Sequence, residues 1–367
     1  MSACYVVLAH TDPDGLVRLV RRIRALSPEA DVVVRFDARD LVSPEALRAE
    51  GAIPLQSRLP VRWGDWSLVD AAREALSFAL RESDADWFSV ISGQDYPVRD
   101  LAAWEEGLQA GHADVVLDPM PAKPQTWEYT WSSFVVRVPG PPLLERLASG
   151  VVSRGSRLLS PWVDIYRLDR TGPRHYWVRR PRRDAARPPF LVKASQWMTV
   201  RRPTLTAALD ELATGSERVD FLRTVLVPDE IALQSLCTAH ADTVREAPTT
   251  AAHFAPEAPS PDWLTPDLIT ALARTGAPFV RKMPPNADTT LLGAADALAT
   301  PPASPLMTTV TGAEENATRE RGTTGRPRPA HARSATEHLP RLHEPTSPEA
   351  QSNEQRHAGH GEQARGE

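Results

Sequence analysis

Short apolar runs alternate with helical repeats over the first 90 residues of the chain. Apolar residues dominate Cys4–Ala9, Asp31–Phe36 and Trp87–Ile91, which have the length and composition of strands buried on both faces of a sheet. Between these runs, apolar residues recur at helical spacing over Leu16–Leu26 and again from Ser67 onward. Strands that alternate with helices through short connections predict an α/β fold with a mostly parallel central sheet flanked by helices.

The pattern weakens after a short strand predicted at Val115–Leu117 and returns further along the chain. Phe190–Val200 is again rich in apolar residues, and Thr204–Leu212 has helical spacing. Another helical stretch follows Pro228, and the last strong helix is expected over Trp263–Arg274. No internal repeat is visible.

Composition separates a folded part of the chain from its C-terminal tail. All 23 aromatic residues lie at or before Phe279, whereas residues 301–367 contain eight Pro and 17 charged residues but no aromatic, Ile or Lys. Such a segment cannot bury enough apolar surface to offset its conformational entropy. We therefore expect one domain over residues 1–297 and a disordered low-complexity tail over residues 298–367.

Charge, hydropathy and cysteine content exclude several classes of protein. A net charge of −5 argues against a nucleic-acid partner. No apolar run approaches the roughly 18–20 residues of a membrane span, which leaves only peripheral membrane association open. No basic segment precedes Cys4–Ala9, so no signal peptide is expected. The two cysteines, Cys4 and Cys237, cannot form a disulfide framework and fit a reduced, cytoplasmic location.

Polar residues follow the predicted strands. His10, Asp37 and Ser92–Asp95 come directly after the three apolar runs. In open α/β sheets, ligands bind outside the carboxyl ends of the strands, so these positions indicate a nucleotide-type site. Neither a GxGxxG fingerprint nor a P-loop is present, which disfavours a dehydrogenase or an NTPase.

Seven motifs occur in an order that resembles the core-2/I-branching glycosyltransferase family, which includes β-1,6-N-acetylglucosaminyltransferases and peptide O-xylosyltransferases. The motifs are YVVLAH at 5–10, FDARD at 36–40, WGDWSLVDA at 63–71, SGQDYP at 92–97, ASQWMTV at 194–200, VPDE at 227–230 and FVRKM at 279–283. The resemblance covers about Ser2–Met283. It implies a GT-A-type nucleotide-sugar domain that uses a UDP-sugar donor and a glycan acceptor, inverts the anomeric centre and needs no metal or other cofactor.

Glu230 is the candidate catalytic base. An inverting sugar transfer needs a carboxylate that accepts the proton of the attacking hydroxyl, and the resemblance assigns this role to the glutamate of the PDE tripeptide. The position after Pro228 predicts the first turn of a helix, where the dipole favours the ionised carboxylate. The alternative is an ordinary helix-start acid, with Asp229 as the next candidate base.

Lys282 is the candidate ligand of the leaving diphosphate. The resemblance implies a lysine in a Phe-x-x-Lys-Phe-like ending, which the chain matches except for Met283. Only three of the 42 basic residues are lysines, namely Lys123, Lys193 and Lys282. The second basic ligand of the family's vertebrate branch is missing, because Ala258–Pro261 occupies that stretch, and Arg281 is the candidate substitute.

Two DxD strings are present, but neither predicts a metal site. Asp12-Pro13-Asp14 has the pattern of a helix cap, and Asp84-Ala85-Asp86 precedes a strand instead of following one. The remaining candidates have ordinary structural alternatives. Those for the donor are Asp37 and His10, and those for the acceptor or pocket are Ser92, Gln94, Asp95, Trp197 and Glu128.

Three readings of the function stay open. The leading one is transfer of N-acetylglucosamine, and the second is xylosyl transfer within the same family. The third is an inactive binding module that docks through the basic, aromatic-containing loop Arg170–Arg187. The missing upstream Arg favours the binding module, whereas the intact PDE tripeptide and Lys282 favour the enzyme.

We predict that the tail is dispensable, because it has little apolar surface to add to a core. Truncation after about residue 297 should leave the melting temperature and the affinity for UDP unchanged. A loss of several degrees would show that the tail packs on the domain.

Overall fold

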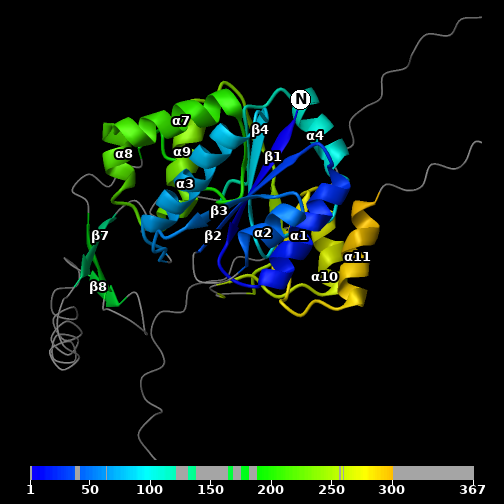
Figure 1. Cartoon of the computed structure of the whole chain (residues 1–367). Coiled ribbons are helices and arrows are strands. Elements are labelled where there is room, and N and C mark those ends of the chain that lie inside the picture. Colours follow the sequence, from blue (N-terminus) through cyan, green and yellow to red (C-terminus); the bar gives the residue numbers. More distant parts are fainter. Residues whose placement is uncertain are drawn as a thin grey trace, which may run out of the picture. The chain divides into compact units, whose positions relative to one another are not determined.

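The computed structural model describes residues 2–37, 42–62, 64–120, 131–137, 164–167, 175–181, 188–255, 258 and 260–300. Within these ranges, the largest sheet has seven strands (Figure 1). In spatial order they are β11 (Val244–Glu246), β6 (Val115–Leu117), β10 (Thr199–Arg201), β4 (Trp87–Ser92), β1 (Ala3–Ala9), β2 (Asp31–Asp37) and β3 (Ile53–Ser57). All neighbouring pairs are parallel except the two that β10 makes with β4 and β6. The predicted mostly parallel sheet is therefore confirmed.

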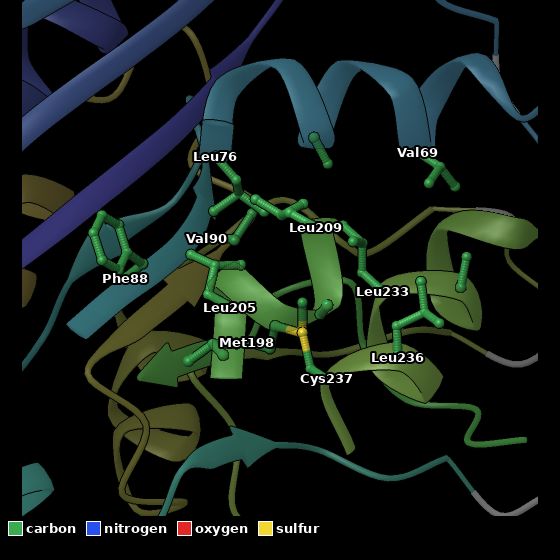
Figure 2. Packing of buried hydrophobic residues seen from close by; sticks show 14 of the residues in the cluster. Val69, Leu76, Phe88, Val90, Met198, Leu205, Leu209, Leu233, Leu236 and Cys237 are labelled. Atoms are coloured by element: carbon green, nitrogen blue, oxygen red, sulfur yellow. The ribbon is translucent and has the colours of Figure 1, made fainter. Parts of the chain in front are cut away.

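Alternating side chains of the central strands point into two separate cores. In β1, Cys4 and Val6 face one core, whereas Tyr5 and Val7 face the other, as the two-residue period of a strand requires. The first core is covered by α3 (Ser67–Glu82), α7 (Arg202–Thr214) and α9 (Ala232–Ala239), which meet in Figure 2. The second is covered by α1 (Pro13–Leu26), α2 (Pro44–Ala49) and the start of α4 (Leu101–Ala110).

A second, smaller sheet connects the C-terminal part of the domain to the end of β4. Its described strands are, in order, β12 (Thr250–Ala252), β13 (Phe279–Arg281) and β5 (Tyr96–Pro97). Because β5 follows β4 after one short turn, its antiparallel pairing with β13 places Arg281 beside that turn. The helices α10 (Pro266–Ala273) and α11 (Thr289–Ala299) share the third core with this sheet.

The remaining described elements are a third sheet and two short helical segments. A third sheet pairs β7 (Trp131–Arg137), β9 (His175–Pro181) and β8 (Asp164–Arg167), all antiparallel. The helix α8 (Glu217–Leu222) and a 3₁₀ turn, η1 (Pro228–Glu230), lie between α7 and α9 in the chain. No helix in the described part of the chain is long and apolar enough to cross a bilayer.

The structure differs from the predicted elements mainly at short or weakly periodic segments. The short α2 and β3 were not predicted, because six and five residues give too little periodicity to detect. The helix expected from Trp263 begins at Pro266, since Thr265 caps it by accepting from the Leu268 N–H at 3.3 Å. The final helix, α11, was missed because alanines form most of its buried stripe.

The end of α11 affects where the tail should be cut. Arg22 of α1 lies 2.8 Å from the Asp296 carboxylate and also donates to the Thr300 hydroxyl at 3.3 Å. These contacts extend past the expected boundary at residue 297. The truncation proposed above therefore belongs after Thr300.

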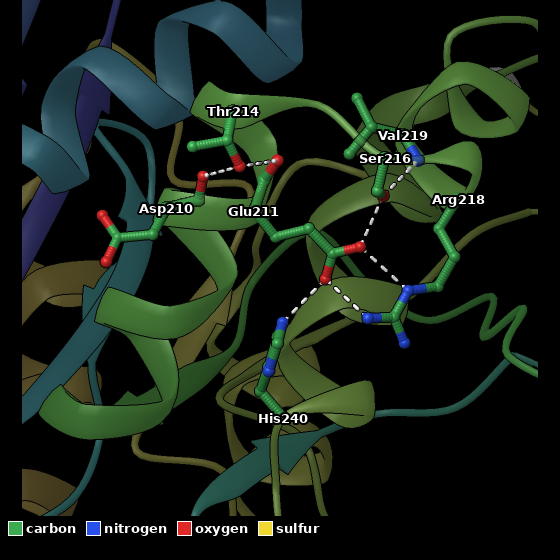
Figure 3. Close-up of polar contacts among 7 residues, drawn as sticks. All are labelled: Asp210, Glu211, Thr214, Ser216, Arg218, Val219 and His240. Carbon is green, nitrogen blue, oxygen red and sulfur yellow. Dashed lines mark hydrogen bonds and ion pairs between the residues drawn. The ribbon is translucent and has the colours of Figure 1, made fainter.

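A carboxylate, Glu211, joins three consecutive helices (Figure 3). It extends from α7 and accepts hydrogen bonds from Arg218 of α8 at 2.7 and 2.9 Å and from the Ser216 hydroxyl at 2.6 Å. His240, at the end of α9, places Nε2 2.7 Å from the same carboxylate. Partial burial raises the pKa of Glu211, but these hydrogen bonds outweigh it and the net pKa is lowered.

We predict that Glu211→Gln destabilises the domain by roughly 1–3 kcal/mol at about pH 7, because Arg218 and His240 lose a charged acceptor. A carboxylate with a lowered pKa stabilises the folded state above its ordinary pKa of 4.5, and this contribution is lost as the pH falls through the lower folded-state value. The difference from wild type in free energy of unfolding, measured with denaturant, should therefore shrink towards about pH 3. If the difference in free energy of unfolding does not depend on pH, the ionised Glu211 carboxylate is not the source of the stabilisation.

Candidate active site

The turn after β4 lies against the end of β1, where the strand order of the sheet changes direction. The Ser92 N–H donates to the Asp95 carboxylate at 3.0 Å, and the Gly93 N–H donates to the Leu8 carbonyl at 3.0 Å. A Cβ at Gly93 would lie 3.0 Å from the Cβ of Ala9, so any side chain there would force the turn or the end of β1 to shift. Such a switch point is where α/β sheets bind ligands.

Asp95 is the buried anchor of this turn. It is 1% exposed, and the Thr250 hydroxyl donates to its Oδ2 at 3.0 Å. Arg281 places Nε 3.6 Å from Oδ1, which is an ion pair without a good hydrogen bond. Burial raises the pKa of Asp95 although Arg281, Ser92 and Thr250 each lower it, and the net pKa is raised. Because Asp95 is buried, we assign it to holding Arg281 and not to direct contact with a sugar.

Two consecutive basic residues, Arg281 at the end of β13 and Lys282 after it, each stack on a tryptophan. The guanidinium of Arg281 lies 4.6 Å from the ring centre of Trp197, which is buried. The Lys282 ammonium lies 4.7 Å from the ring centre of Trp263, which is half exposed. Partial burial and the neighbouring charge of Arg281 lower the pKa of Lys282. Both causes disfavour the charged ammonium, so an anion bound beside Lys282 would be stabilised by it and would raise its pKa again.

The main chain fixes the position of this basic pair. The Met283 N–H donates to the Gln94 carbonyl at 2.9 Å, which ties the FVRKM segment to the turn after β4. The Leu264 N–H donates to the Lys282 carbonyl at 3.0 Å, which holds the segment that carries Trp263 alongside. Motifs from positions 92–97 and 279–283 therefore meet in space.

Glu230 ends the 3₁₀ turn, and the α-helix begins only at Ala232. The prediction that Glu230 lies in the first turn of an α-helix is therefore corrected, and the helix-dipole argument for its ionisation weakens. A side chain supplies the positive charge instead. The Lys193 ammonium lies 3.8 Å from Glu230 Oε2, and the two side chains are 16% and 29% exposed.

Hydrogen bonds clamp the Glu230 turn to the ASQWMTV segment. The Ala194 N–H donates to the Glu230 carbonyl at 3.0 Å. The Gln234 amide donates to the Asp229 carbonyl at 2.8 Å and to the Ser195 carbonyl at 3.2 Å. Trp197 belongs to the same segment, and Arg281 stacks on its ring. One segment therefore contacts both the Glu230 turn and Arg281.

Asp229 is an acidic neighbour of Glu230. Its Oδ1 atom is buried and has no hydrogen-bond partner among the residues that the structure describes. Burial, reinforced by the charge of Glu230, raises the pKa of Asp229 to about 7. Asp229 therefore carries a proton for much of the time near neutral pH, so Glu230 is the carboxyl of this pair that is better suited to remain ionised.

The two remaining donor candidates lie at or just after the ends of strands of the central sheet. His10 is exposed and follows β1, and Asp37 is the last residue of β2. Because β1, β2 and β4 are parallel, both lie at the same sheet edge as Ser92. Glu128 lies outside the described residues.

The two DxD strings take structural positions. Asp12 caps α1 by accepting from the Gly15 N–H at 3.0 Å, as predicted. Asp86 precedes β4 and pairs its N–H with the Ser2 carbonyl at 2.9 Å, at the edge opposite the strand ends named above. Among the described residues, no group of three His, Cys, Asp or Glu side chains is placed to hold a metal ion.

Three contributors were not identified from the sequence. Thr250 and Trp263 carry no motif, and only tertiary contacts place them beside Asp95 and Lys282. Lys193 had a signal that was available, since it is one of three lysines and directly precedes the ASQWMTV motif.

Comparison with known proteins supports the family suggested by the motifs. The Core-2/I-Branching enzyme family model matches residues 44–113, which run from α2 to the loop after α4 and include the turn after β4. No curated protein gives a significant match.

Solved structures give distant likenesses. They include TarS (residues 1–349) from S. aureus (12% identity, TM-score 0.31, 66% of this chain and 57% of that one). HddC from Yersinia pseudotuberculosis has 14% identity and a TM-score of 0.24 over 33% of this chain and 59% of its own. A putative nucleotide-diphospho-sugar transferase from Desulfovibrio desulfuricans has 15% identity and a TM-score of 0.24 over 32% of this chain and 59% of its own. The chain thus spans less than two thirds of each. The mostly parallel α/β architecture follows from the seven-stranded sheet itself. The ordered motifs and the match over residues 44–113 agree in making the chain similar to the Core-2/I-Branching enzyme family.

Proposed function

We propose that the protein is an inverting glycosyltransferase that moves a sugar, with N-acetylglucosamine as the first candidate, from a UDP-sugar to a hydroxyl of a glycan acceptor. The observation that carries the proposal is that one segment supports both the candidate proton acceptor and the two basic residues. The segment clamped to Glu230 also bears Trp197, on which Arg281 stacks next to Lys282. A proton acceptor and a pair of cations therefore belong to one connected structure.

The reaction assigns one role to each end of this structure. Glu230 takes the proton from the acceptor hydroxyl as that oxygen forms a bond to C1 of the sugar. The bond between C1 and the UDP oxygen breaks on the opposite face, and its electron pair leaves with UDP. Lys282, with Arg281, then meets the negative charge that grows on the diphosphate. No divalent metal is needed in this proposal, because the two cations replace it.

A binding module without turnover is the second candidate, and one observation favours it. Arg281 already forms an ion pair with Asp95, and Ala258–Pro261 contains no basic residue. Lys282 would therefore have to neutralise much of the negative charge of the diphosphate by itself. Titrating UDP into the protein while assaying transfer separates the two candidates. Binding without transfer of any sugar, xylose included, would favour the module.

We predict that Glu230→Gln retains binding of the UDP-sugar but loses transfer by about 10²–10⁴-fold, because an amide cannot accept the acceptor's proton. Calorimetry with the donor and a transfer assay measure the two effects. Asp229→Asn is the matched control and should retain more activity. If Glu230→Gln stays within a few-fold of wild type while Asp229→Asn is inactive, Asp229 is the base.

We predict that transfer survives EDTA but not the loss of Lys282. Lys282→Ala should lower kcat as well as the affinity for the donor, since the charge that the ammonium meets grows in the transition state. Arg281→Ala provides the comparison, and a similar loss would support its role beside Lys282. Activity abolished by EDTA and restored by manganese would contradict the metal-free proposal.

A further inference from the structure

We propose that Lys193 is a positioning residue for the catalytic base: it fixes the Glu230 carboxylate and keeps it ionised for proton abstraction. This inference rests on the proposed function, because it presumes that Glu230 is the base. The electrostatic coupling between the Lys193 ammonium and the Glu230 carboxylate can be tested without any substrate.

The geometry makes Lys193 a neighbour of Glu230 in two ways. The ammonium lies 3.8 Å from Oε2. The next residue along the chain, Ala194, donates its N–H to the Glu230 carbonyl at 3.0 Å. The main-chain bond places the lysine Cα beside the turn, so the ammonium is directed to the carboxylate at little cost in side-chain entropy.

The burial of the pair gives the charge its effect. The Lys193 side chain is 16% exposed and that of Glu230 is 29% exposed, so the interaction is screened less than at an open surface. A cation at this distance favours the ionised carboxylate. The charge of Lys193 matters here because Glu230 precedes α9 and does not lie within its first turn.

Among the charged groups on the described elements around Glu230, Lys193 forms an ion pair with the carboxylate. Within η1, Asp229 is the other titratable group, and its carboxyl disfavours a second negative charge beside it. The adjoining α9 has no charged residue in its sequence. On α3, which packs against η1, Arg73 and Glu74 form ion pairs with Asp70 at 3.7 Å and with Arg35 at 3.1 Å.

The composition of the chain is consistent with a specific role for the cation at this position. Arg replaces Lys at nearly every basic site, yet Lys193 and Lys282 remain in the two segments that bear the site. An ammonium is a compact charge, whereas a guanidinium is a broad, planar fork. A lysine suits a single carboxylate oxygen in a confined turn.

The test measures the titration of Glu230 directly. In protein labelled with ¹³C at the glutamate carboxyl carbons, the Glu230 resonance is assigned by its loss in Glu230→Gln. In Lys193→Met, which keeps the length of the side chain, the Glu230 midpoint should rise by about one pH unit. Lys193→Arg should restore most of the wild-type midpoint. Lys193→Gln is the second neutral variant and gives the same expectation if Lys193→Met does not fold.

Arg48→Met is the control for loss of a positive charge in general. Arg48 is exposed on α2 and pairs with Glu45 at 3.3 Å. This variant should leave the Glu230 midpoint unchanged. In the transfer assay, the acid limb of kcat should move to higher pH in Lys193→Met and not in Arg48→Met, which loss of structure alone would not produce.

The outcomes separate the two proposals. An unshifted Glu230 midpoint in the folded Lys193→Met protein overturns this inference whatever the activity. A shifted midpoint in a protein whose wild type transfers no sugar supports the charge coupling and overturns the proposed function instead.

Discussion

The buried ion pair between Asp95 and Arg281 is the interaction on which the candidate site depends. It joins the turn after β4, at the switch point of the central sheet, to the end of β13 in the second sheet. Removing either partner would leave the other charge buried without compensation, which is much more costly than losing a surface ion pair. The pair therefore determines where Lys282 can lie, although Lys282 itself makes no contact with Asp95.

A different set of contacts holds the proposed base. Main-chain and amide hydrogen bonds tie the Glu230 turn to the segment that contains Lys193 and Trp197. Arg281 stacks on Trp197, so the two halves of the site meet at one aromatic ring. The proposed proton acceptor and the proposed phosphate-binding cations are thus connected through packed, largely buried groups. Packed support of this kind keeps side chains in a fixed arrangement.

The sequence predicted well those elements whose pattern is long and regular. The strands β1, β2 and β4 and the helices α1 and α3 follow from apolar spacing, and the cap at Asp12 follows from its residue type. The motifs also identified Glu230 and Lys282 as candidates. The partners of these residues could not be predicted in the same way. Lys193 and Glu230 are far apart in the chain, and only the tertiary fold brings them together. Burial likewise changed the reading of Asp95, whose sequence context is compatible with either a pocket residue or a structural anchor.

The stereochemistry of the product tests the account most directly. A single displacement, in which Glu230 deprotonates the acceptor while the departing UDP leaves from the opposite face, converts an α-linked UDP-sugar into a β-linked product. The measurement is the anomeric configuration of the transferred sugar, read by NMR from the first product formed with a UDP-sugar and a glycan acceptor in the presence of EDTA. The account predicts a β linkage. An α linkage, formed by the same protein under the same conditions, would contradict it.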